Sequence, residues 1–222
     1  MTRRSLWIGV LVTIATLIVA YPVAYFLATT SPRRRNILLV LLVIPWWCSI
    51  LVKNFAWIAL LSETGVINTV LFTLGLIRQP IQLVYTETAV VIGLVHVLVP
   101  FMVLPIYATL DRLDPRLSEA AASLGCGPTR CFLEITLPLS LPGVAAGSIL
   151  TFVLAFGSFI TPALLGSERT VMVANIIEDQ FMRAFHWPFG SAIAIVLLVL
   201  VMSILVIFER LVGLERIWGS SR

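Results

Sequence analysis

The stretch that decides the fold runs from Asp111 to Gly143 and reads DRLDPRLSEAAASLGCGPTRCFLEITLPLSLPG. It is the longest polar interruption in a chain that is otherwise almost continuously apolar. Asp114 is placed to cap a helix that begins at Pro115, where the missing N–H of proline costs nothing. The apolar residues of this helix recur at helical spacing and predict one alanine-rich stripe: Leu117, Ala120, Ala121 and Leu124.

Two glycines and a proline follow this helix. Gly125 and Gly127 allow the positive φ that commonly ends a helix, and Pro128 can open another. The stretch therefore predicts two short helices joined by a glycine elbow, outside the membrane and between two spans. A solvated loop that happens to be helical is the alternative. It would not explain the small-residue face, or a second helix that runs directly into a span.

The motif within this stretch resembles the signature of binding-protein-dependent ABC importer permeases. That signature is Glu-Ala-Ala, three residues, Gly, nine residues and then Ile-x-Leu-Pro, and every position and both spacings occur here. The matching residues are Glu119, Ala120, Ala121, Gly125, Ile135, Leu137 and Pro138. In that family this cytoplasmic loop is the coupling element that docks into a groove on the ATPase subunit. The resemblance implies the same role for these residues.

The composition places the chain in a membrane independently of the motif. Of its 222 residues, 59% are hydrophobic and 12% are charged, and the mean hydropathy is +1.04. A soluble domain needs more polar residues than this to cover its surface. The net charge of +4 comes almost wholly from arginine, because Lys53 is the only lysine. This balance is typical of cytoplasmic-face arginine in a membrane protein, and we reject nucleic-acid binding.

The apolar runs predict an all-α, polytopic membrane protein, and the resemblance implies the type I ABC importer permease fold. A single transmembrane domain is expected over residues 1–222. The predicted spans are 6–29, 37–61, 87–110, 141–165 and 189–208, and the predicted cytoplasmic coupling loop covers 111–140. Within the fourth of these, Gly143–Ser148 is small enough for close packing between helices.

The distribution of basic residues predicts the orientation. The faces assigned to the cytoplasm hold nine arginines, whereas the outer loops hold three. Because cytoplasmic loops are enriched in Lys and Arg, the loop that contains Glu119 is predicted to be cytoplasmic. The same alternation places Arg3 and Arg4 on the outer side, against the rule.

Beyond the motif, nearly the whole chain resembles the permease subunits of spermidine/putrescine importers. The resembling stretches are YPVAYFLA (21–28), IPWW (44–47), VPFMVLPIY (99–107), FITPALLG (159–166), NIIEDQF (175–181) and WPFG (187–190). Members of that family generally have a further span ahead of the position of Leu6. Together with Arg3 and Arg4 on the outer side, this predicts a sixth span upstream in the reading frame. A naturally shortened permease is the alternative.

The sequence contains no recognisable catalytic motif: no GxxxxGK[ST], no HExxH, and no GxSxG with plausible triad partners. We therefore expect no enzyme activity, catalytic site, metal or cofactor, and the energy must come from another subunit. A membrane-embedded enzyme that uses His96 or His186 and a purely structural membrane protein are the alternatives. The cysteines lack paired ligand spacing and are expected to be free thiols: Cys48, Cys126 and Cys131.

The resemblance also implies partners and a location. The chain would lie in the bacterial inner membrane, in contact with lipid, as one of two permease subunits that form a path by alternating access. A pair of ATP-binding ATPase subunits would drive it, and a periplasmic or extracellular substrate-binding protein would deliver the ligand.

The predicted ligand is a linear polyamine, putrescine or spermidine. Glu178 and Asp179 adjoin in the outer segment, and Trp46 and Trp47 lie within a span. Carboxylates bind ammonium groups by charge-assisted hydrogen bonds, and an indole face attracts cations. The acidic pair can instead serve only the docking protein or solvent, and paired tryptophans often only pack. Permeases for iron, sulfate, phosphonate, opine or amino acid-like ligands are the alternative assignments.

Two polar side chains within the predicted spans have alternative interpretations. Lys53 is expected to snorkel to the outer interface, with a role in lining the translocation path as the alternative. His96 either has a functional role or makes a hydrogen bond between two helices.

Overall fold

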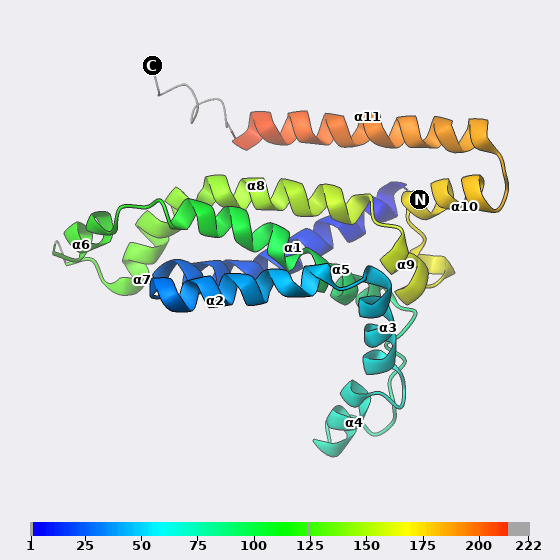
Figure 1. The fold of residues 1–222 in the computed structure, drawn as a ribbon, viewed down its shortest axis with the longest axis horizontal. Helices are drawn as coiled ribbons and strands as arrows, with labels where there is room; N and C mark the ends of the chain where they lie inside the picture. The colour runs from blue at the N-terminus through cyan, green and yellow to red at the C-terminus, as the bar shows by residue number, and fades with distance from the viewer. Residues whose placement is uncertain (1, 124, 213–222) are drawn as a thin grey trace.

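The computed structural model of the protein describes residues 2–123 and 125–212. Within those residues every regular element is helical, which agrees with the all-α prediction. Three long helices pack along one another and form the central bundle (Figure 1): α1 (Thr2–Thr29), α5 (Glu87–Leu110) and α8 (Leu137–Phe156). The side chains buried between them are mostly apolar.

Five stretches of the described chain are long and apolar enough to cross a membrane, which is the predicted number of spans. They are Thr2–Thr29, Ile50–Thr73, Glu87–Leu110, Pro128–Phe156 and Trp187–Val206. A helix bonds its own backbone N–H and C=O groups, so an apolar chain crosses a bilayer most readily in this form.

The second predicted span, 37–61, is not one helix. The chain there forms three elements: α2 (Pro32–Val43), the 3₁₀ turn η1 (Ile44–Trp47) and α3 (Ile50–Leu61). Pro45 explains the break, because it lacks the N–H that would continue the ladder and its ring clashes with the preceding turn. Ser49 restarts the helix, since its Oγ accepts a 3.3 Å hydrogen bond from the Leu51 N–H.

After the break the chain projects from the bundle as an arm. In Figure 1, α3 leaves the direction of α2 at a steep angle and leads to α4 (Val66–Thr73) at the tip. The buried Asn68 closes the arm: its amide accepts from the Ile81 N–H at 2.9 Å and donates to the Ile81 carbonyl at 2.9 Å. It also donates to the Ser62 carbonyl at 3.0 Å. The arm is therefore a folded unit.

The fourth span is shifted relative to the predicted 141–165. α8 ends at Phe156, because Gly157 is a poor helix former, and a separate short helix α9 (Ile160–Leu165) follows. At the other end the apolar helix reaches back to Pro128. The last part of the predicted loop 111–140 is therefore helical and continuous with the span.

The end of the bundle that the charge distribution predicts to be the outer one carries the elements that follow α9. The 3₁₀ turn η3 (Glu168–Thr170) and α10 (Val173–Met182) lie at the end opposite to α6 (Pro115–Ser123) (Figure 1). α10 is joined to the start of α1, because the Val173 N–H donates to Ser5 Oγ at 2.9 Å. Arg3 and Arg4 therefore lie at the end of the bundle opposite to α6.

The last described helix, α11 (Trp187–Val212), covers the predicted span 189–208. It packs mainly against α10 and runs alongside α8 with fewer contacts (Figure 1). Its apolar side chains are largely exposed in the isolated chain, for example Ile195 and Val196.

Two glycines allow α8 to approach α5 closely. A Cβ added at Gly143 would lie 2.5 Å from Thr109 Oγ1 and 2.7 Å from the Pro105 carbonyl oxygen. A Cβ added at Gly147 would lie 2.9 Å from Met102 Sδ and 3.0 Å from the Met102 carbonyl oxygen. The run Gly143–Ser148 therefore packs backbone against backbone, as its small residues predict.

We predict that Gly143→Leu destabilises the protein by about 1–3 kcal/mol, because a side chain there must push α5 and α8 apart. Ala146→Leu is the matched control, since Ala146 lies on the same helix and is exposed. Thermal unfolding of the purified chain in detergent is expected to show a lower midpoint for Gly143→Leu only. Equal midpoints for the two variants would contradict the close packing.

Candidate functional site

The coupling segment, defined as residues Asp111–Gly143, begins with the predicted helix and elbow. Asp114 caps α6, because its Oδ1 accepts from the Arg116 N–H at 2.9 Å. Gly125 has φ +85°, and the Cys126 N–H donates back to the Ala121 carbonyl at 3.1 Å. This is how a glycine in the left-handed region closes a helix end. The predicted elbow at Gly125 is therefore confirmed.

The second half of the coupling segment runs without interruption into the span. α7 (Pro128–Cys131) is followed by the π-helical turn η2 (Phe132–Thr136), and α8 begins at the next residue. Pro138 gives a physical reason for the wider turn, because it has no N–H to donate and would clash with the carbonyl four residues earlier. A π turn re-spaces the backbone at such a position. Movement of α7 is thus connected directly to α8.

The signature residues lie along this segment in different environments. Ala120, Gly125 and Pro138 are exposed, whereas Ala121, Ile135 and Leu137 are partly buried. Glu119 belongs to α6, but its side chain lies outside the described part of the structure, as does the whole of Leu124. The structure therefore brings the signature together at one end of the bundle without describing the direction of the Glu119 carboxylate.

The solvent face of the coupling segment combines apolar and charged groups. Leu117 and Leu133 are 48% and 54% exposed. Arg130 pairs with Glu134 one turn later, with 2.8 Å between Nε and Oε1, and both side chains are mostly in solvent. Exposed leucines among charged residues favour a surface that another protein covers.

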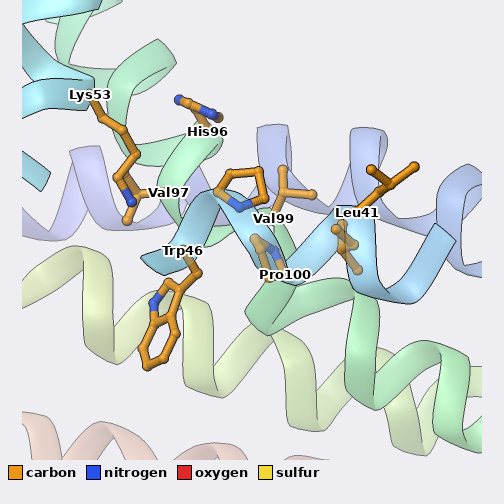
Figure 2. A pocket seen from close by; sticks show the side chains of 9 residues that line it. Leu41, Trp46, Lys53, His96, Val97, Val99 and Pro100 are labelled. Atoms are coloured by element: carbon orange, nitrogen blue, oxygen red, sulfur yellow. The ribbon is translucent and has the colours of Figure 1, made fainter. Parts of the chain in front are cut away.

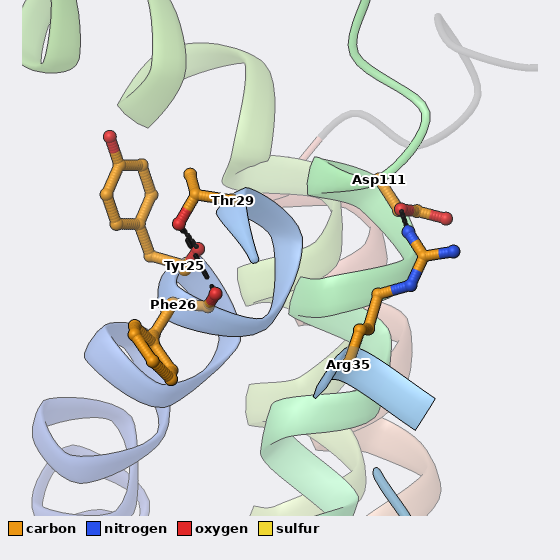
Figure 3. Close-up of polar contacts among 5 residues, drawn as sticks. All are labelled: Tyr25, Phe26, Thr29, Arg35 and Asp111. Carbon is orange, nitrogen blue, oxygen red and sulfur yellow. Dashed lines mark hydrogen bonds and ion pairs between the residues drawn. The ribbon is translucent and has the colours of Figure 1, made fainter. Parts of the chain in front are cut away.

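The sequence analysis missed an ion pair where the coupling segment leaves α5. Arg35 Nη1 lies 2.6 Å from Asp111 Oδ1 (Figure 3), and the guanidinium carbon lies 6.0 Å from the centre of the Tyr107 ring. Arg35 is one of the nine arginines from which the orientation is predicted. No local pattern signals this pair, because its members are 76 residues apart.

A cavity of about 210 Å³ lies beside the break between α2 and α3. Its lining comes from three parts of the chain, with Trp46 on η1, Lys53 on α3 and His96 on α5 (Figure 2). The Trp46 ring packs edge-on against Phe101, with 5.8 Å between ring centres. Trp47 does not line this cavity; it is 85% exposed and borders a separate hollow on α2. The two tryptophans that the sequence pairs are therefore separated.

His96 and Lys53, which both line this cavity, differ in their hydrogen-bond and ion-pair partners. His96 Nδ1 accepts a 3.0 Å hydrogen bond from Trp57 Nε1, which joins α5 to α3. The structure thus contains the helix-to-helix bond that was one interpretation of His96. Lys53 lines the cavity and makes no ion pair within the described residues.

The predicted acidic pair lies in a groove at the outer end. Glu178 and Asp179 line it together with Glu168 of η3, and its volume is about 380 Å³. Arg183 also lines the groove, and its Nε lies 3.7 Å from Asp179 Oδ1. Three carboxylates and one guanidinium leave the described lining negatively charged. We call this site the outer acidic groove.

Other candidate chemistry is sparse in the described chain. No group of three or more His, Cys, Asp or Glu side chains there is arranged to hold a metal ion. All three cysteines are free thiols, with Cys48 exposed and Cys131 buried.

Comparison with known proteins identifies the family. The family described as "Binding-protein-dependent transport system inner membrane component" matches residues 7–213. The chain is 38% identical to the "Spermidine/putrescine transport system permease protein PotB" of Haemophilus influenzae over 93% of its own length and 72% of that protein. Against the protein of the same name from Escherichia coli, the identity is again 38%, over 93% and 75% of the two chains.

A solved structure shares the fold. A chain of the bacterial alginate ABC transporter, crystallised with an alginate pentasaccharide-bound periplasmic protein, superposes with a TM-score of 0.79 at 16% identity. The superposition covers 94% of this chain and 75% of that one. At such identity the likeness concerns the fold alone. The family match and the identity to the two permeases show that this chain belongs to the binding-protein-dependent family of ABC importer permeases, which are multi-pass inner membrane proteins and not enzymes.

Proposed function

We propose that this chain forms part of the translocation path for a polyamine, putrescine or spermidine, across the inner membrane. A separate pair of ATPase subunits drives the cycle, a second permease subunit completes the path, and a binding protein delivers the ligand to the outer end. The observation that carries the proposal is the coupling segment, whose exposed elbow and signature spacing lie at the end opposite to the outer acidic groove.

The geometry of the coupling segment supports docking of an ATPase. α6 and α7 stand at the end of the bundle, and the exposed Leu117 and Leu133 provide apolar contacts there. Because α7 continues into α8, a partner that moves the tip also moves a membrane helix. Glu119, Ala120, Ala121, Gly125, Ile135, Leu137 and Pro138 are the residues that we assign to this role.

The outer acidic groove supports a cationic ligand. Glu178 and Asp179 would bind ammonium groups by charge-assisted hydrogen bonds, and the names of the two relatives specify spermidine and putrescine for those proteins. Arg183 lowers the net negative charge but leaves carboxylates in excess. This groove is the side on which a binding protein would release its ligand.

The cavity beside Trp46 plays a different part in the proposal. A polyamine held there would meet Lys53, and two like charges about 4 Å apart near a protein surface repel by roughly 4 kcal/mol. We therefore assign Trp46 to passage along the path and not to a resting site. Trp47, which is exposed and borders a separate hollow on α2, is assigned to the same path. An indole face attracts a cation by about 0.5–2 kcal/mol, which is compatible with transient contact.

The first prediction from this proposal concerns coupling. Gly125→Val is expected to uncouple ATP hydrolysis from uptake, because a β-branched residue is strained at φ +85°. Glu119→Arg is expected to weaken ATPase association by reversing a charge on α6. Both variants are expected to insert into the membrane as wild type does. Uptake by the assembled importer and co-purification of the ATPase measure the two effects.

The coupling segment offers a matched control. Gly127→Val changes the same residue type two positions later, where φ is −67° and no atom lies within 4 Å of an added Cβ. It is expected to retain uptake. Normal uptake by both Gly125→Val and Glu119→Arg at wild-type expression would contradict the docking proposal.

The second prediction concerns the ligand. Wild type with its partner subunits is expected to take up radiolabelled putrescine or spermidine in cells that lack other polyamine importers. Asp179→Asn is expected to raise KM about tenfold, because a hydrogen bond to a charged group contributes about 1.5–3 kcal/mol. Trp47→Leu is expected to lower the rate of uptake. Glu63→Gln, an exposed carboxylate outside the groove, is the control.

These results test the identity of the ligand and the assignment of its binding residues separately. If wild type takes up neither polyamine, the proposed substrate is wrong. If uptake occurs and both Asp179→Asn and Trp47→Leu match wild type, the substrate stands and the assignment of these residues is wrong.

A further inference from the structure

The coupling segment joins the bundle at two points, at Asp111 and at Phe132, which we call its roots. Both roots contact the hairpin formed by α1 and α2. We propose that this hairpin receives the movement of the coupling segment, and that Phe132 and Asp111 are the positioning residues that transmit it. The inference rests on the proposed docking of an ATPase at the coupling segment. It adds which part of the bundle the docked subunit moves, and through which side chains.

The first attachment lies where the coupling segment enters the membrane. The Phe132 ring of η2 packs edge-on against two tyrosines of α1, with ring centres 5.9 Å from Tyr21 and 5.4 Å from Tyr25. Edge-to-face pairs of this kind contribute more than the burial of the rings alone. The π-helical turn thus connects to α1 at the point where the backbone leaves regular helical spacing.

A polar contact strengthens the same attachment about two turns further along the chain. Tyr21 Oη and Ser140 Oγ lie 2.9 Å apart, and Ser140 Oγ also donates to the Leu137 carbonyl at 2.8 Å. Ser140 is fully buried. Breaking a hydrogen bond here would leave polar atoms unpaired in an apolar environment, so the contact between α8 and α1 resists separation.

The second attachment lies where the coupling segment leaves α5. Asp111, the first residue of the segment, pairs with Arg35 in the first turn of α2 at 2.6 Å (Figure 3). The Arg35 and Asp111 side chains are 27% and 38% exposed, so water screens this pair less than it screens an ion pair in full solvent.

The tip of the coupling segment depends on these roots. The main contacts of α6 are with α7 and η2, and not with the long helices of the bundle. A force on α6 therefore reaches the bundle through η2 on one side and through the link at Asp111 on the other. Besides the covalent continuation of the segment into α5 and α8, the contacts of Phe132 reach α1 and the ion pair of Asp111 reaches α2.

Of the two helices of the hairpin, α2 is the less tightly packed. α2 has no fully buried residue, although Leu38, Leu39 and Leu42 pack partly against the core. It ends at the break Ile44–Trp47, where Trp46 lines the cavity. A shift of α2 at its Arg35 end would therefore change the position of Trp46 at its other end. This connects the cytoplasmic tip with the proposed path.

The test uses the assembled importer in membrane vesicles and measures substrate taken up per ATP hydrolysed. Phe132→Leu removes the ring contacts with Tyr21 and Tyr25 and is expected to lower that ratio about fivefold or more, the lower end of typical coupling between sites. ATPase co-purification is expected to stay at the wild-type value, and any fall in the unfolding midpoint is expected to be no larger than that of the control variant Phe152→Leu. Asp111→Asn is expected to lower the ratio in the same way.

Phe152→Leu is the matched control. Like Phe132 of η2, Phe152 is half-buried and packs against α1, at Gly9. Phe152 lies on α8, toward the end of that helix away from η2, and stacks on Phe156. It is expected to leave the ratio unchanged. An equal loss in Phe132→Leu and Phe152→Leu would overturn the inference, because it would indicate general loosening of the bundle.

The outcomes distinguish this inference from the proposed function. If the wild-type chain does not bind an ATPase, the docking proposal fails and this inference fails with it. If docking and wild-type uptake are normal, and Phe132→Leu and Asp111→Asn both keep the wild-type ratio, only the role of the hairpin is wrong.

Discussion

The structure depends on one constraint, which is that backbone N–H and C=O groups in the hydrocarbon core must be bonded within the protein. Continuous helices meet it over most of the described chain. The interruptions at Ile44–Trp47, Phe132–Thr136 and Gly157 each need local compensation, by a 3₁₀ turn, a π turn or a capping contact. The first two lie beside the cavity at Trp46 and at the root of the coupling segment. Two of the three interruptions therefore lie in parts of the chain to which we assign a functional role.

Lipid surrounds the helices with apolar groups, so helix association relies on close packing and a few polar contacts. Gly143 and Gly147 bring α8 against α5, and Tyr21 and Ser140 join α1 to α8. The result is a central bundle of three helices with less tightly attached elements around it. α2 and α11 are peripheral in this sense, whereas α6 and α7 extend beyond the bundle end. This division suits a protein in which a partner moves some helices relative to others.

Local residue chemistry was sufficient to predict the coupling segment. Asp114, Gly125 and Pro128 act where their side chains or φ preferences predict, because caps and elbows depend on neighbouring residues only. The predicted second span, 37–61, is not one helix, and hydropathy alone could not reveal this because it does not register the loss of one backbone donor at Pro45. The shift of the fourth span has a similar origin, since an apolar run continues past the helix end at Gly157.

Contacts between distant residues were beyond prediction from one sequence. The pairs Arg35–Asp111 and Tyr21–Ser140 join residues that are 76 and 119 positions apart. Trp46 and Trp47 adjoin in the sequence, yet only Trp46 lines the cavity, because successive side chains of a tight turn point in different directions. The proximity of Glu178 and Asp179 was easier to predict, because the two residues adjoin on α10 and line the same groove.

The proposed function depends above all on contact between the tip of the coupling segment and an ATPase subunit. Site-specific cross-linking tests this most directly, with Ala120→Cys on α6 and Glu63→Cys on the turn between α3 and α4, each in a background without the native cysteines. The assembled importer is expected to form a cross-link to the ATPase from position 120, with a yield that changes when ATP is added, and none from position 63. A cross-link from neither position, in an importer that still takes up substrate, would contradict the account.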